Sequence, residues 1–163
     1  MHLYHFTDCD HLHGVGRFGL TIGDVPTDIH RWEGRCGVWL TSDDTAHGHG
    51  LEGSPLDKSR YRLTVGIAED DPSLEKWIEW SAKNVTPVTI RFLHAAASGF
   101  NTWYVYFGVI DPAKIEACTD MQTGLAIENW RETPEGNVRP VPPERRHVWH
   151  KKLMKKLRRQ TAA

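Results

Sequence analysis

The chain has few cysteines, no long apolar run and no low-complexity segment. Its three cysteines, Cys9, Cys36 and Cys118, are odd in number and far apart, so they do not make a disulfide framework. No apolar run approaches the ~20 residues of a transmembrane helix, and the N-terminus lacks the basic start and apolar stretch of a signal peptide. We therefore expect a cytoplasmic protein without a transmembrane segment.

Composition and charge indicate one folded domain followed by a tail. The chain has 163 residues, 39% of them hydrophobic and 25% charged, which is ordinary for a globular protein of one domain. The net charge of −1 hides an asymmetry, because residues 144–163 hold eight Lys/Arg and one acid while 12 basic and 20 acidic residues remain in 1–143. We expect a domain over 1–143 and a basic tail over 144–163.

Hydrophobic periodicity predicts mostly strands with one or two early helices. Alternating or aromatic-rich segments predict strands at His2–Thr7, Cys36–Thr41, Arg60–Ile67 and Trp103–Ile110, with a further candidate at Leu125–Arg131. One helix is predicted over Asp8–Phe18, with Asp8 or Asp10 placed to cap it and Gly19 to end it, and another from the cap Asp71 onward. Thr21–Arg35 and Ser42–Pro55 are expected to be loops, and Pro87–Ser98 is ambiguous. This order predicts an α+β fold with a mostly antiparallel sheet.

Two apparent motifs do not carry a function. Gly14–Gly19 matches the G-x-G-x-x-G pattern of dinucleotide-binding sites, but no strand directly precedes it and no long helix follows it. Ten histidines raise the possibility of zinc, yet Cys9, His11 and His13 have no spacing typical of a closed zinc site. We interpret these histidines as solvated loop residues and expect no metal.

Four short motifs occur in a characteristic order between residues 2 and 115. They are Leu3-Tyr4-His5-Phe6-Thr7, Leu12-x-x-Val15-x-x-x-Gly19-Leu20, Gly37-Val38-Trp39-Leu40-Thr41-Ser42-Asp43 and Tyr104-Val105-Tyr106-Phe107-Gly108-Val109-Ile110-Asp111-Pro112. This arrangement resembles the ADP-ribosyltransferase superfamily, in particular its diphtheria-toxin-like and poly-ADP-ribose-polymerase-like branch and the related RNA 2′-phosphotransferases. The resemblance implies the split, mostly antiparallel sheet of that superfamily, with few helices. The basic C-terminal helix of this chain is predicted from the tail sequence itself.

The resemblance also implies a site for NAD. His5 matches the histidine that bonds the ribose next to nicotinamide, and Trp39 matches the tyrosine that stacks on the nicotinamide ring. Phe6 and Thr7 match the clamp on the carboxamide. The other matching positions are Thr41 and Ser42, the small residues after the stacking ring, and Trp103, which falls where the catalytic glutamate of the superfamily stands.

The departure at Trp103 affects the chemistry, because an indole N–H donates a hydrogen bond but takes no proton. Either another acid, from Asp43–Asp44 or Glu52, reaches the site, or the chemistry needs none, as in the RNA 2′-phosphotransferases. Arg17 and Arg62 are candidates for a pyrophosphate, which a guanidinium binds well. The alternative interpretation makes His5, Trp39 and Trp103 core residues and Arg62 a solvated one.

We expect an enzyme that transfers ADP-ribose from NAD to a protein or a nucleic acid. A non-catalytic module that binds NAD or an ADP-ribose-type nucleotide, and an RNA 2′-phosphotransferase-like enzyme, are the alternatives. The tail from Glu144 to Arg159 is predicted to be a basic amphipathic helix. It either docks on the acidic body of the chain, binds nucleic acid through residues 145–159, or lies on an anionic membrane.

Overall fold

The computed structural model describes residues 1–163 and confirms the α+β fold with a mostly antiparallel sheet. The main sheet has seven strands, all paired antiparallel. In spatial order they are β6 (Leu74–Lys76), β7 (Trp103–Tyr106), β4 (Val38–Thr41), β1 (His2–Thr7), β5 (Tyr61–Gly66), β8 (Ile115–Asp120) and β9 (Leu125–Ala126). A separate hairpin consists of β2 (Asp24–Asp28) and β3 (Glu33–Cys36).

The sheet divides between β1 and β4. Strand β1 pairs with β5 along its whole length, and β4 pairs with β7 over all four of its residues. Between β1 and β4, in contrast, the only paired residues are Tyr4 and Thr41. The two halves of the sheet therefore separate beyond that pair, and backbone groups that a regular sheet would pair are available for other contacts.

Local signals explain the first helix, α1 (Cys9–Phe18). The carboxylate of Asp8 accepts hydrogen bonds from the backbone N–H groups of Asp10 and His11, which satisfies donors at the helix start. The helix ends at Gly19, whose φ of +79° favours glycine and whose missing Cβ leaves space for the Ile110 carbonyl. The prediction of a capped helix ending at Gly19 is confirmed.

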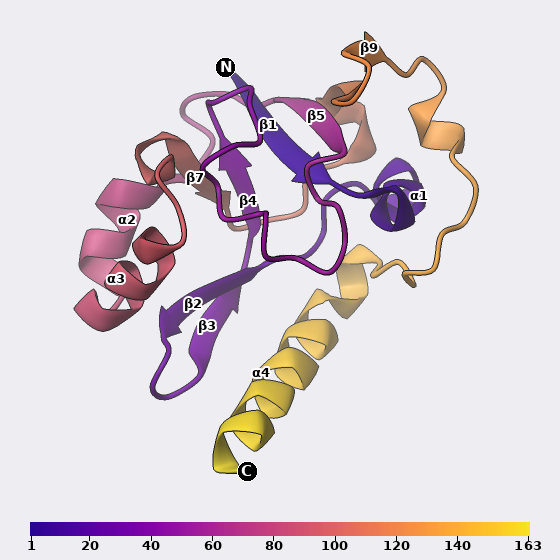
Figure 1. The fold of residues 1–163 in the computed structure, drawn as a ribbon. Helices are drawn as coiled ribbons and strands as arrows, with labels where there is room; N and C mark the ends of the chain where they lie inside the picture. Colours follow the sequence, from indigo (N-terminus) through magenta and orange to yellow (C-terminus); the bar gives the residue numbers. More distant parts are fainter.

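The core lies on both faces of the sheet. On one face, Leu12 and Val15 of α1 pack with Leu3, Leu40 and other strand residues. The opposite face is covered by α2 (Trp77–Asn84) and α3 (Pro87–Ala95), whose side chains pack around a cluster rich in tryptophan. In Figure 1, α1 lies on one side of the strands and α2 with α3 on the other. The place where β1 and β4 separate therefore has helices on both faces of the sheet.

Several local predictions were wrong because tertiary pairing decided the structure. The segment Leu74–Lys76 is not the start of a helix but strand β6, which pairs with β7, and Asp71 instead accepts hydrogen bonds from Ser73 N–H and the Tyr106 hydroxyl. The expected loop Thr21–Arg35 contains the β2–β3 hairpin. The strand candidate Leu125–Arg131 shortens to β9, and β8 was not predicted at all.

The basic tail forms the helix α4 (Arg146–Ala162). It is attached to the body near its first turns, where Arg146 Nε donates to the Thr21 carbonyl and His150 Nε2 donates to the Gly34 carbonyl at 2.9 Å. Its C-terminal end projects away from the main sheet beside the β2–β3 hairpin (Figure 1). None of the helices combines the length and apolar composition needed to span a membrane.

Candidate functional site

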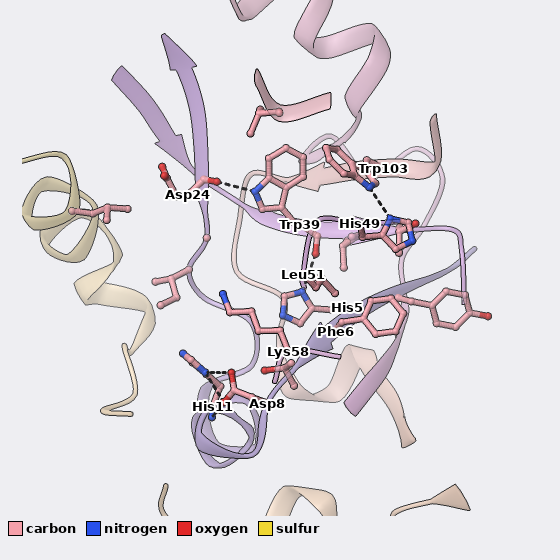
Figure 2. A pocket seen from close by; sticks show the side chains of 18 of the residues that line it. His5, Phe6, Asp8, His11, Asp24, Trp39, His49, Leu51, Lys58 and Trp103 are labelled. Atoms are coloured by element: carbon pink, nitrogen blue, oxygen red, sulfur yellow. Dashed lines mark hydrogen bonds and ion pairs between the residues drawn. The ribbon is translucent and has the colours of Figure 1, made fainter. Parts of the chain in front are cut away.

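A cavity of about 570 Å³ opens where β1 and β4 separate (Figure 2). It is lined by residues of β1, α1, β2, β4, β7, α3 and α4 and of the loops before α1, before β2 and after β4. The lining residues are Tyr4, His5, Phe6, Thr7, Asp8, His11, Ile22, Gly23, Asp24, Trp39, Leu40, Thr41, His49, Leu51, Lys58, Leu93, Trp103, Trp149 and Leu153. Its volume is within the 300–1,000 Å³ typical of small-molecule sites, and its lining mixes aromatic with a few polar groups.

His5 bridges the separated strands. Its Nδ1 lies 2.8 Å from the backbone carbonyl oxygen of Trp39, and since a carbonyl only accepts, Nδ1 carries the proton. In the neutral ring Nε2 then has a free lone pair. Burial lowers the pKa of His5 from 6.5 to about 4, against the raising effect of the Trp39 carbonyl, and nearby Lys58 lowers it further. At neutral pH this histidine is an uncharged hydrogen-bond acceptor at the cavity wall.

Trp39 forms an aromatic wall of the cavity. Its indole N–H donates to the Asp24 carbonyl oxygen at 2.8 Å, which fixes the orientation of the ring. The ring centroid lies 4.9 Å from that of Trp77 and 5.4 Å from that of Trp103, both in tilted or edge-on geometry. Trp39 is only partly buried, so it contributes to the core and also presents surface to the cavity.

Asp8 and His11 form a hydrogen-bonded pair at the cavity edge. His11 Nδ1 lies 2.8 and 2.9 Å from the two carboxylate oxygens of Asp8. The Asp8 side chain is 4% exposed and also holds two backbone N–H groups of α1, whereas the His11 side chain is 32% exposed. A carboxylate on Nδ1 fixes the tautomer of a neutral histidine and leaves Nε2 as the proton acceptor. The pair has the arrangement of a general base with its orienting acid.

Trp103 is engaged by a second histidine. Its indole N–H donates to His49 Nδ1 at 2.9 Å, so the His49 proton is on Nε2, which lies 3.3 Å from the Asp43 carboxylate. Hydrogen bonds from Thr45 together with the nearby His49 hold the pKa of Asp43 below its usual value. None of the three candidate acids lines the cavity itself. Asp43 is connected to it through His49, whereas Asp44 lies 3.8 Å from Arg62 and Glu52 lies 3.8 Å from His47.

The cavity is bordered by the C-terminal helix. Trp149 and Leu153, four residues apart on α4, contribute to the lining together with Asp24 of β2. One carboxylate oxygen of Asp24 is buried without a hydrogen-bond partner, and burial raises the pKa of this group while nearby His150 lowers it. The tail therefore forms part of the site.

The structure brings six of the nine predicted site residues to the cavity: His5, Phe6, Thr7, Trp39, Thr41 and Trp103. It does not bring Ser42, Arg17 or Arg62 there. Ser42 is exposed after β4, Arg17 lies over the Phe18 ring at the end of α1, and Arg62 donates to the Asp44 carbonyl at 2.9 Å. Because these two arginines have partners elsewhere, the positive charge of the cavity comes from Lys58 instead, the only Lys or Arg that lines it.

Sequence reasoning missed the second set of polar residues. Asp8 was considered only as a helix cap and His11 only as a solvated or metal-binding histidine, although their spacing of three on a helix places them together. His49, Lys58 and Trp149 come from loops and from the tail, and no local pattern marks them. No group of three or more His, Cys, Asp or Glu side chains is arranged to hold a metal ion. Comparison of the chain with protein-family models, curated proteins and solved structures found no match.

Proposed function

We propose that the protein is a mono-ADP-ribosyltransferase-like enzyme that uses NAD and modifies a macromolecule. The observation that carries the proposal is the hydrogen bond from His5 Nδ1 to the Trp39 carbonyl, which places neutral His5, with its free Nε2, and the Trp39 ring on the wall of one cavity where β1 and β4 separate. These are the two positions that the superfamily resemblance assigns to the ribose and to the nicotinamide.

In this proposal the cavity binds the nicotinamide end of NAD. The Trp39 ring stacks on the cationic nicotinamide, an interaction that aromatic faces favour. His5 Nε2 accepts a hydrogen bond from a ribose hydroxyl, which requires the uncharged ring that burial maintains. Lys58 provides the positive charge for the pyrophosphate.

The reaction breaks the bond between ribose C1 and the nicotinamide nitrogen, and its electron pair neutralises the pyridinium ring. The oxocarbenium-like C1 is then attacked by a nucleophile of the acceptor, whose proton must be removed. Trp103 cannot take that proton, because its indole has no basic lone pair and its N–H is bonded to His49. His11 can take it at Nε2, because its Nδ1 is held by the Asp8 carboxylate. Positioning and electrostatic stabilisation supply the remainder of the catalysis.

The test is release of nicotinamide from NAD, measured by chromatography and mass spectrometry. Nicotinamide release by the wild-type protein is expected to be lost in His5→Asn, which retains a donor for the Trp39 carbonyl but has no group at the Nε2 position. His30→Asn, an exposed histidine of the hairpin, is the matched control and is expected to retain activity. Release that is equal in all three proteins contradicts the proposal.

A second candidate is a module that binds NAD without cleaving it. It is favoured by the absence of a carboxylate at Trp103 and by the engagement of that side chain with His49. The same samples distinguish the two candidates, since such a module binds NAD in a calorimeter and releases no nicotinamide. Transfer of a 2′-phosphate from RNA to NAD, the third candidate, is detected by incubating a 2′-phosphorylated oligonucleotide with NAD.

A further inference from the structure

We propose that α4 is a docking surface for single-stranded nucleic acid and delivers it to the cavity. Binding of nucleic acid by α4 does not depend on the proposed function, whereas the delivery of the strand as an acceptor of ADP-ribose rests on it. The residues that form this cationic face are Lys151, Lys152, Lys155, Lys156, Arg158 and Arg159, all of them exposed.

The cationic face carries charge that the protein itself does not neutralise. Helix α4 contains no acidic residue, and none of its Lys or Arg side chains lies within 4.0 Å of a carboxylate. The helix is attached instead through hydrogen bonds of Arg146 and His150 to backbone carbonyls. Docking of the tail on the acidic body therefore does not account for these six charges. Unpaired Lys and Arg side chains on one helix are suited to a row of phosphates.

The cationic face adjoins the cavity. Trp149 and Leu153 form the line on α4 that borders the cavity. Because each residue advances about 100° around the helix, the side chain next to this line is Lys156, and Lys152 and Arg159 follow it around the helix. A phosphate backbone bound along these three cations would run beside the opening. The bases of that strand would then be within reach of the aromatic side chains of the site.

The aromatic lining favours a single strand over a duplex. Proteins that bind single strands combine cations for the backbone with aromatic rings on which bases stack. Trp149, which lines the cavity from α4, is such a ring, and a base paired in a duplex cannot stack on it. A membrane surface is a poorer match, because the apolar side chains Leu153 and Leu157 are partly buried and the exposed positions of α4 are polar or alanine.

The test is fluorescence anisotropy with a labelled 20-nucleotide single strand of mixed sequence, prepared as DNA and as RNA. The test variant is Lys152→Gln/Lys156→Gln/Arg159→Gln in the full chain. The matched control, with the same change of charge, removes three exposed cations of β6, α2 and α3 that also lack ion pairs. It is Lys76→Gln/Lys83→Gln/Arg91→Gln.

We expect the test variant to bind the single strand at least about tenfold more weakly, and the control to bind as the wild type does. The slope of log affinity on log salt should fall by about 2, since each lost single-strand phosphate contact removes about 0.7. Equal weakening in both variants overturns the proposal. It is also overturned by equal affinity of the wild type for polyglutamate, or by tighter binding to phosphatidylserine vesicles than to the strand.

Nicotinamide release from NAD separates this inference from the function on which its acceptor role rests. The surface is supported and the enzyme is not if the strand binds through α4 and NAD stays intact. The enzyme is supported and the binding surface is overturned if NAD is cleaved but the strand does not bind. If both hold, mass spectrometry of the strand is expected to show the mass of added ADP-ribose, and an unmodified strand overturns its role as acceptor.

Discussion

The low pKa of His5 predicts a specific loss of stability in acid. A histidine that takes up a proton near pH 6.5 when unfolded, but only near pH 4 when folded, leaves the unfolded state with more protons between these values. Stability must therefore fall as the pH falls from about 6.5 to about 4. At 1.36 kcal/mol for each pH unit, the difference corresponds to about 3 kcal/mol at most, of which about 2 kcal/mol is lost by pH 5.

The measurement compares the wild type with His5→Asn in urea unfolding at pH 7 and pH 5. The asparagine amide can donate to the Trp39 carbonyl as Nδ1 does, but it does not titrate. All other histidines and carboxylates are common to both proteins, so their effects cancel in the difference. We expect the wild type to lose about 2 kcal/mol relative to His5→Asn between the two pH values, or roughly 4–8 °C in melting temperature.

A pH-independent difference between the two proteins would refute the burial argument for His5. It would mean that solvent reaches the ring freely, so that burial does not lower the pKa of His5. The control His30→Asn, exposed at the hairpin, should follow the wild type at both pH values.

Three further predictions concern the frame of the site. Gly19→Ala should destabilise the protein by about 2 kcal/mol or more in urea unfolding, because φ is +79° and the new Cβ meets backbone, whereas Gly53→Ala, with open space around it, should not. Trp103→Phe should cost about 1–3 kcal/mol by leaving buried His49 Nδ1 without its donor, and a neutral thermal melt would contradict this. Asp8→Ala should lower stability by about 1 kcal/mol through loss of the helix cap, and Asp8→Asn by less, compared by circular dichroism.

The elements predicted correctly are those with local causes. The alternation of His2–Thr7 predicts a strand, the cap and terminating glycine of α1 predict a helix, and in both cases the distant contacts made in the fold agree with the local signal. The prediction failed at Leu74–Lys76, where Asp71 and Pro72 favour a helix start. There, hydrogen bonding to the edge of β7 stabilises a strand, and that edge is set by residues about thirty positions away.

Only part of the candidate site could be predicted from the sequence. His5 and Trp39 belong to motifs on neighbouring strands, so the fold brings them together once the sheet forms. For Arg62 the alternation predicts a polar face, and the structure places its guanidinium on the Asp44 backbone rather than at the cavity. His49 and Lys58 lie in the irregular segment between β4 and β5, whose path depends on tertiary contacts such as the bond to Trp103.

The structural and the proposed chemical roles of His5 have one origin. Because β1 and β4 pair only at Tyr4 and Thr41, the Trp39 carbonyl lacks a strand partner, and a buried carbonyl without a donor is costly. His5 Nδ1 donates to this carbonyl in place of a strand partner, and the ring then presents Nε2 to the cavity as an acceptor. His5→Ala would remove both functions together, whereas His5→Asn retains the donor near Nδ1 and removes only Nε2. A folded His5→Asn protein that binds NAD weakly or fails to cleave it would assign Nε2 to the ligand, and unchanged cleavage would assign His5 to the fold alone.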